Sequence, residues 1–130
     1  MRLLVDTNVF LELLLEQARS AEARQLLEKI EANEFFVSDY ALHSIGMLLF
    51  RRKQSEVFRR FLADVNTSLM MVSLTAKDLD RVIDASTAFN LDFDDAYQYT
   101  VAGKYDLTIV SFDADFDRTD RGRKQPAALL

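Results

Sequence analysis

The sequence predicts an α/β fold: one three-layer domain in which helices flank a central, mostly parallel β-sheet of four to five strands. Short apolar segments alternate along the chain with longer segments in which apolar residues recur at helical spacing. Strands that are apolar on both faces are typical of a parallel sheet covered by helices on both sides. Neither a linker nor an internal repeat divides the 130 residues, so we expect residues 1–130 to form a single domain.

The first half of the chain is expected to supply two strands and three helices. The strands are the short apolar runs Arg2–Val5 and Phe35–Val37. Apolar residues spaced three or four positions apart predict the helices, which run over Thr7–Gln17, Ser20–Ile30 and Asp39–Arg52. Ser20 is expected to cap the second of these helices, because a serine hydroxyl can accept a hydrogen bond from the first helical turn.

The second half of the chain continues the same alternation. Further apolar runs predict strands at Leu69–Val72 and Leu107–Val110. Helical spacing predicts helices over Val57–Val65, Leu79–Phe89 and Asp92–Gly103. The second of these follows Thr75-Ala-Lys-Asp78, which resembles a capping box. The region from Phe112 to the end of the chain gives no clear pattern.

The composition excludes several kinds of site. The chain has no cysteine, which excludes disulfide scaffolds, thiolate zinc sites and cysteine nucleophiles. Its single histidine, His43, excludes a multi-histidine metal site. The glycines are scattered and form neither a phosphate-binding loop nor a dinucleotide fingerprint, and a serine nucleophile elbow is missing as well.

Charge and hydropathy bear on partners and location. The formal net charge of −5 by itself argues against a basic surface for nucleic acid, although arginines gather at residues 51–60 and 118–124. Asp6 interrupts the apolar stretch that a signal peptide would need. The longest nearly uncharged stretch, Tyr40–Phe50, is too short to span a bilayer. We therefore expect a cytoplasmic protein that does not enter a membrane.

Carboxylates follow three of the four predicted strands. Asp6 comes directly after the first strand, Asp39 just after the second and Asp113 just beyond the fourth, while Asp92, Asp94 and Asp95 begin the helix before the fourth. Since the carboxyl ends of parallel strands lie along one edge of the sheet, these acids are expected to share that edge. Gathered carboxylates repel one another, and Mg²⁺ or Mn²⁺ is the kind of cation that oxygen ligands hold. The sequence therefore predicts a site for one or two such ions.

Each acid also has a purely structural interpretation. Asp6 can cap the first helix, and Asp92 with Asp95 can form an acidic capping box. Asp113 and Asp115 fit ordinary turn chemistry. Asp94 and Asp95 lie about 100° apart on a helix, so only one of the two is expected to point into a shared site. The metal interpretation rests on their joint placement at one edge.

Three segments resemble the PIN-domain family, which includes the VapC-type toxins of bacterial toxin–antitoxin systems. The opening Leu3-Leu-Val-Asp-Thr-Asn-Val-Phe10 resembles the first strand of that family, and Leu91-Asp-Phe-Asp-Asp-Ala-Tyr97 resembles its central acidic helix start. Val110-Ser-Phe-Asp-Ala-Asp-Phe116 resembles its closing segment, where a Thr or Ser precedes an Asp by two residues.

The resemblance implies a metal-dependent endoribonuclease that cleaves RNA phosphodiester bonds, the toxin half of a toxin–antitoxin pair. It carries over Asp6, Asp95 and Asp113 as catalytic metal ligands, with Asn8 and Ser111 as polar supports. Asp92 and Asp115 are further possible supports. The implied partners are an RNA substrate, a small antitoxin protein and a second copy of the chain in a homodimer.

One position departs from the family pattern. The family has a glutamate early in the helix after the second strand, in a pattern such as Ser-x-x-x-x-Glu, whereas here Ser38 is followed five residues later by His43. A histidine can ligate manganese but brings no negative charge. Asp39 lies four residues before His43 on the same helix face and is the candidate to supply the carboxylate. His43 can equally be an ordinary packed histidine.

Two other functions remain open at this stage. A catalytically weakened PIN-like domain would bind RNA or protein, with the site impaired at His43. An aspartate-based phosphotransfer fold would use Asp6, since Asp6-Thr7-Asn8 follows a first strand. The phosphatase version of that fold needs an Asp where Asn8 stands, and the receiver version needs an Asp at the end of the third strand.

Overall fold

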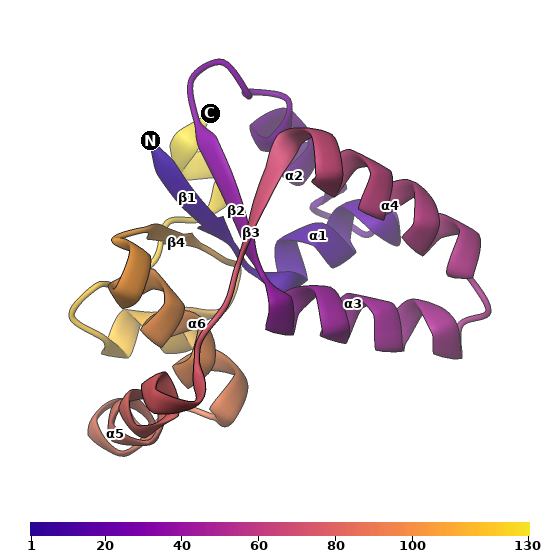
Figure 1. Ribbon diagram of the computed structural model, residues 1–130. Helices are drawn as coiled ribbons and strands as arrows, with labels where there is room; N and C mark the ends of the chain where they lie inside the picture. The colour runs from indigo at the N-terminus through magenta and orange to yellow at the C-terminus, as the bar shows by residue number, and fades with distance from the viewer.

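The computed structural model, which describes residues 1–130, is built around a four-stranded sheet in the order β3-β2-β1-β4, with every neighbouring pair parallel (Figure 1). The four strands are β1 (Arg2–Val5), β2 (Glu34–Ser38), β3 (Leu69–Val72) and β4 (Thr108–Val110). The prediction of a mostly parallel central sheet is confirmed. Each predicted strand lies within one residue of its observed bounds. Apolar runs buried on both faces mark β1, β2 and β4 directly, whereas β3 is an edge strand whose Met70 and Met71 are exposed.

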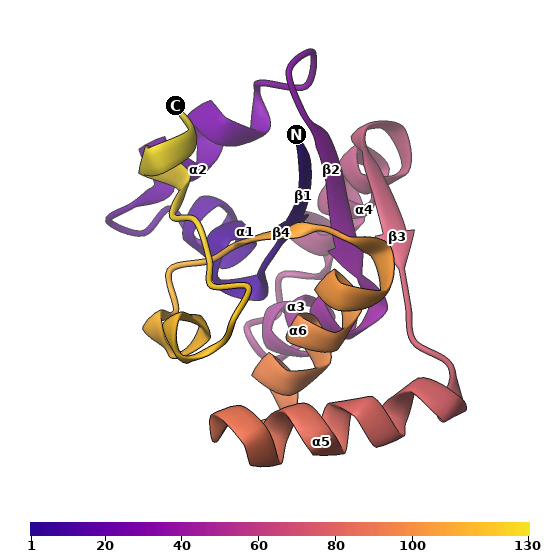
Figure 2. The same cartoon turned by 90° about the vertical axis from the view of Figure 1, so that its left-hand side faces the viewer.

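Six α-helices cover the two faces of this sheet. They are α1 (Thr7–Leu14), α2 (Ser20–Leu27), α3 (Asp39–Arg51), α4 (Ser55–Ser68), α5 (Leu79–Phe89) and α6 (Phe93–Tyr105). Figures 1 and 2 show α1–α4 gathered on one side of the strands, whereas α6 lies on the other side with α5 packed across it. Short 3₁₀ helices complete the chain, at η1 (Ala76–Asp78), η2 (Ala114–Arg118) and η3 (Pro126–Leu129). The three-layer α/β architecture is therefore confirmed.

Two apolar cores lie on opposite faces of the sheet. Along β1, Leu3 and Val5 point into the core shared with α1–α4, while Leu4 points into the core shared with α5 and α6. All three side chains are fully buried. This alternation is the two-residue period of a strand, and it explains why β1 is apolar without interruption.

Several helix ends differ from the sequence prediction. Helix α1 ends at Leu14 rather than Gln17, because Glu16 adopts a left-handed φ of 52° that a helix cannot contain. Helix α4 extends beyond the predicted Val57–Val65 at both ends, since only its buried middle carries the apolar pattern. Arg19 rather than Ser20 occupies the N-cap of α2. The capping box of Thr75 and Asp78 is present, but it opens η1 before α5 begins.

The order of the strands reverses beside β1. The chain proceeds from β1 outward to β2 and β3, and later returns to place β4 on the other side of β1. The backbone N–H of Asp6 donates to Val110 O at 2.9 Å, so the ends of β1 and β4 are held together. Such a reversal leaves a crevice at the carboxyl edge of a parallel sheet, which is where ligands bind in open α/β folds.

The η2 part of the segment after β4 is fastened to the α6 side of the sheet, whereas η3 packs against α2 on the other side. Phe116, in η2, has no exposed surface and belongs to the same core as Val101 and Ile109. Lys124 then returns to pair with Val110 at the edge of β4.

No helix of the structure is both long enough and apolar enough to cross a membrane.

Replacing Phe116 with alanine is expected to destabilise the fold by about 3–5 kcal/mol, because it leaves a cavity under η2. The free energy of unfolding is measured by denaturant titration. The matched control is Phe50→Ala, since Phe50 is 64% exposed, and it should cost about 1 kcal/mol at most. Equal losses in the two variants would contradict the anchoring role given to Phe116.

Candidate metal centre

Asp6 stands at the junction of β1 and α1, at the carboxyl edge of the sheet. It is the N-cap residue of α1, with extended backbone angles, and its Oδ1 accepts a hydrogen bond from Thr7 N at 2.8 Å. The capping interpretation of Asp6 is thus correct as far as it goes. Its side chain is nevertheless only 7% exposed and makes further contacts that a cap does not need.

Ser111 joins Asp6 to the end of β4. Its buried hydroxyl donates to Asp6 Oδ2 at 2.6 Å and accepts from the Asp113 backbone N–H at 2.9 Å. Asn8 braces the same hydroxyl, since its Nδ2 donates to Ser111 Oγ at 3.2 Å and its Oδ1 accepts from Phe112 N. These bonds hold Asp6 and the chain leading to Asp113 in one fixed arrangement.

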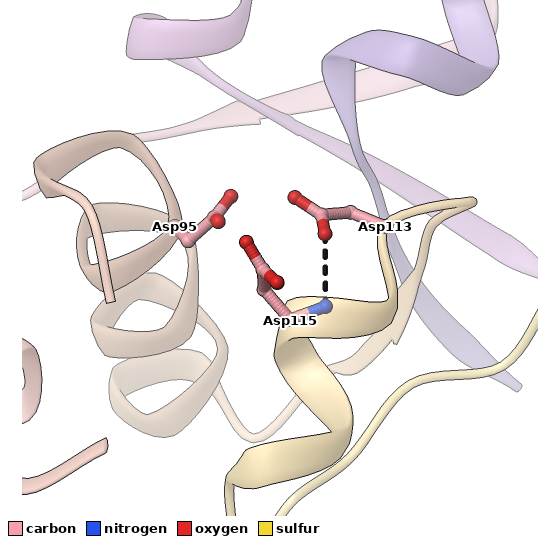
Figure 3. Close-up of side chains that lie close together, drawn as sticks. All are labelled: Asp95, Asp113 and Asp115. Carbon is pink, nitrogen blue, oxygen red and sulfur yellow. Dashed lines mark hydrogen bonds between the residues drawn. The ribbon is translucent and has the colours of Figure 1, made fainter. Parts of the chain in front are cut away.

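Three further carboxylates converge beside this network. Asp95 projects from the first turn of α6, Asp113 follows β4, and Asp115 lies in η2 (Figure 3). One oxygen of each lies within 4.8 Å of the others, and Figure 3 shows the three side chains directed toward the same space. The Asp115 backbone N–H donates to Asp113 Oδ1 at 2.8 Å, which orients the Asp113 carboxylate.

The carboxylates surround a cavity of about 210 Å³. It is polar, and its walls come from the start of α1, the first turns of α3 and α6, and the segment after β4. The lining residues are Asp6, Thr7, Asn8, Leu11, Tyr40, Ser44, Asp94, Asp95, Gln98 and Asp113. We call this the acidic pocket. No lysine or arginine lines it.

Burial and like charge disfavour ionisation in the acidic pocket. Burial raises the pKa of Asp95 to about 7, and the charge of Asp113, followed by those of Asp6 and Asp115, acts in the same direction. Burial also raises the pKa of Asp6, although hydrogen bonds from Ser111, Gln98 and Thr7 oppose that rise. Protein donors therefore compensate in part for the burial of the Asp6 carboxylate, whereas no hydrogen bond opposes the rise in the pKa of Asp95.

The residues of the acidic pocket fit a hard divalent cation. Carboxylate oxygens are the ligands that Mg²⁺ and Mn²⁺ prefer, and Asp6, Asp95 and Asp113 form no ion pair with any basic side chain. A second observation is independent of charge. The buried Oε1 of Gln98, in the wall of the pocket, has no hydrogen-bond partner, an arrangement that costs about 1–3 kcal/mol.

The structure brings together most of the residues singled out in the sequence. Asp6, Asp95 and Asp113 line one pocket, Asn8 and Ser111 brace Asp6, and Asp115 joins Asp95 and Asp113. Asp115, expected only as a support, thus offers an oxygen within 4.8 Å of oxygens of both Asp95 and Asp113.

Three of the expected supports are not brought to the pocket. His43 is exposed and lines a separate apolar hollow that also contains Met47 and Phe50. Successive side chains of a helix point about 100° apart, so His43 points away from the pocket when the next residue of α3 points into it. The side chain facing the pocket from this part of α3 is Ser44. Asp39 instead accepts hydrogen bonds from Tyr97 Oη and Tyr40 N, and exposed Asp92 makes no capping bond through its side chain.

Gln98, Ser44 and Tyr40 line the pocket although no sequence motif pointed to them, and only one of Asp94 and Asp95 was expected there. Both line it, with Asp95 buried and Asp94 exposed at its rim. Two spacings carried the missing signal. Gln98 follows Asp95 by three residues, and Ser44 follows Tyr40 by four, so each pair shares a helix face.

Comparison with known proteins identifies a family. The model of the PIN domain matches residues 3–122. A comparison with curated proteins finds no match. This match agrees with the parallel sheet and its strand order. It also excludes the aspartate-based phosphotransfer fold, which the sequence alone left open as an alternative.

Solved structures of low sequence identity share the fold. VapC20 of Mycobacterium tuberculosis, described as a sarcin–ricin loop cleaving toxin, superposes with a TM-score of 0.79 at 21% identity, over 95% of this chain and 99% of that one. VapBC2 from Rickettsia felis, solved on a DNA fragment from their promoter, gives 0.79 at 16% identity over 96% and 98%. A toxin–antitoxin complex from Klebsiella pneumoniae gives 0.72 at 21% identity over 95% and 96%.

Asp95→Asn is expected to stabilise the protein in EDTA at neutral and higher pH. The raised pKa means that the folded protein binds a proton more tightly than the unfolded chain, so stability falls as pH rises from about 4 to 7. Asparagine cannot ionise, and the variant should gain about 3–5 °C in melting temperature at pH 8, which corresponds to about 1 kcal/mol.

The gain should shrink toward zero as the pH falls below about 4, because Asp95 then becomes protonated in the unfolded chain as well as in the folded protein. The matched control is Asp84→Asn on the exposed face of α5, which should leave the pH profile unchanged. A constant difference between Asp95→Asn and the original protein at all pH values would contradict the electrostatic cause.

Proposed function

The chain belongs to the PIN domain family, and on that premise we propose that it is a metal-dependent endoribonuclease that hydrolyses RNA phosphodiester bonds. The observation that carries the proposal is the acidic pocket. Its carboxylates come from three separate parts of the chain, and no basic side chain among its lining residues neutralises them. A bound cation is the simplest means of neutralising these carboxylates so that a negatively charged phosphate can bind in the pocket.

In this proposal Asp6, Asp95 and Asp113 are the catalytic residues that hold Mg²⁺ or Mn²⁺, as one or two ions. The 4.8 Å limit on the oxygens of Asp95, Asp113 and Asp115 supports adding Asp115 to this set. When bound, the cation supplies Lewis-acid polarisation of a phosphodiester and activation of water.

The protein's own groups provide orientation. The Ser111 hydroxyl donates to Oδ2 of Asp6, and the Thr7 N–H donates to Oδ1. These hydrogen bonds fix the orientation of the Asp6 carboxylate and therefore the direction of its remaining lone pairs. Asn8 keeps Ser111 in place, and the Asp115 N–H does the same for Asp113. Preorganised ligands of this kind lose little freedom when a cation binds, so binding is stronger.

The biological role that we propose is the toxin of a toxin–antitoxin pair, held inactive by a small antitoxin protein. The family assignment supports this role, as does the fold shared with the toxins reported above. A cytoplasmic location and a homodimer belong to the same proposal. Light scattering at micromolar concentration measures the oligomeric state.

A weakened domain that binds RNA or protein is the second candidate. The observation in its favour is that the two side chains that α3 turns toward the acidic pocket, Tyr40 and Ser44, carry no charge at neutral pH. Asp94 at the rim offers a carboxylate from the neighbouring α6 instead. Cleavage and binding measurements on the same preparation distinguish the two functions.

Freshly purified protein free of any partner is expected to cleave a panel of structured RNAs in Mn²⁺ and to be inactive in EDTA. Asp6→Asn, Asp95→Asn and Asp113→Asn should each reduce the cleavage rate by more than the roughly 10–100-fold typical of losing an outer-shell partner. Mn²⁺ should also raise the melting temperature, because a ligand bound only by the folded state stabilises it.

Asp84→Asn, an exposed carboxylate remote from the pocket, is the control and should retain both cleavage and the Mn²⁺ shift. Retention of activity in Asp95→Asn would remove the acidic pocket from the mechanism. RNA binding without cleavage by the original protein would favour the second candidate.

Ser44→Glu is expected to strengthen Mn²⁺ binding by about tenfold, because it adds a carboxylate ligand to the pocket wall. His43→Glu adds the same charge one residue away, but it should leave Mn²⁺ affinity nearly unchanged, since His43 faces the apolar hollow. Titration calorimetry compares the two variants. A larger effect at position 43 than at 44 would contradict the observed phase of α3.

A further inference from the structure

Gln98 is a buried polar residue in the wall of the acidic pocket, with 2% of its surface exposed. It lies on α6, three residues after Asp95. Its Nε2 donates to Asp6 Oδ1 at 3.1 Å. Because a carboxylate only accepts hydrogen bonds, this contact fixes which end of the amide faces Asp6 and directs Oε1 elsewhere.

The Oε1 atom of Gln98 is buried and receives no hydrogen bond from the protein. Two other buried side-chain oxygens share this condition, on Glu12 and Gln54, but neither residue lines the acidic pocket. The carboxylates that surround the pocket cannot donate once they are ionised. The hydroxyls of Thr7, Tyr40 and Ser44 also line the pocket, but none of them donates to this oxygen. The remaining partner for Oε1 is a donor that enters the pocket from outside.

Water held by a divalent cation is such a donor. Mg²⁺ and Mn²⁺ in protein sites commonly retain water molecules, whose hydrogens point away from the ion toward neighbouring acceptors. We propose that Gln98 is a positioning residue whose Nε2 orients Asp6 while its Oε1 accepts a hydrogen bond from a water on the cation in the acidic pocket. This inference rests on the metal site of the proposed function.

The two ends of the amide then act on the same ion by different routes. Nε2 acts through a protein ligand, and Oε1 acts on a solvent ligand. Gln98 would thereby favour a hydrated, oxygen-ligated ion and fix the direction of one of its waters. The number and exchange rate of the waters on the ion distinguish this role from a purely structural one. The test therefore measures the hydration of the ion as well as its affinity for the protein.

The experiment uses Mn²⁺ as the probe on the full chain. Free Mn²⁺ is measured by electron paramagnetic resonance to give the dissociation constant, and water proton relaxation reports the number and exchange rate of waters on the bound ion. Gln98→Met, similar in size but without polar groups, is expected to weaken binding by about tenfold or more and to speed water exchange.

Gln54→Met is the matched control, because it removes a buried, unpartnered amide oxygen outside the acidic pocket. It should leave both Mn²⁺ readouts unchanged. Gln98→Glu retains an acceptor while losing the donor to Asp6, so slow water exchange should survive in this variant. It also keeps the proposal testable if Gln98→Met fails to fold, which circular dichroism reveals.

Three results would overturn the inference. The first is unchanged Mn²⁺ affinity and water exchange in Gln98→Met while Asp95→Asn abolishes binding, in which case the proposed function survives without a role for Gln98. The second is equal weakening and equally fast exchange in Gln98→Met and Gln98→Glu, which would assign the whole effect to the Nε2 contact with Asp6. The third is absence of saturable Mn²⁺ binding by the original protein, which would remove the metal site itself.

Discussion

Repulsion among carboxylates at the carboxyl edge of the sheet is the constraint on which the site depends. Asp6, Asp95 and Asp113 come from distant parts of the sequence and line one cavity, and Asp115 lies beside Asp95 and Asp113. Three protein donors oppose the rise that burial causes in the pKa of Asp6 without cancelling it, whereas Asp95 has no comparable support and its pKa rises to about 7. The repulsion among these carboxylates is therefore relieved only when protons or a cation bind in the pocket.

The topology of the sheet produces this convergence. Because β4 returns to the free side of β1, the residues that follow these two strands meet at the point where the strand order reverses. Ser111 then converts closeness into a fixed geometry, since one buried hydroxyl contacts Asp6, Asn8 and the Asp113 backbone. If β4 did not lie beside β1, the same aspartates would follow the same strands but would no longer lie close together.

The sequence predicted the strands and the acids that follow them, because both depend on period-two burial and on the common direction of parallel strands. It did not predict which side chains of α3 face the site. His43 and Ser44 differ by one residue, and only the packing of α3 against its neighbours decides which of them faces the pocket. The contact of Gln98 with Asp6 spans 92 residues, a separation that no local pattern encodes.

A purely structural role for the acids predicts a different arrangement. Where the fold needs to neutralise a carboxylate, it uses nearby basic side chains, as in the pairs Arg123–Asp117 at 3.1 Å and Lys104–Asp78 at 2.6 Å. Arg118 reaches the edge of the acidic cluster, but it pairs with Asp115 at 3.5 Å in a half-exposed contact, which contributes little. Asp6, Asp95 and Asp113 have no such partner. Since basic residues neutralise acids nearby and none reaches these three, a counter-charge from solution is the arrangement that the side chains favour, and it reconciles a net charge of −5 with the phosphate substrate of the proposed function.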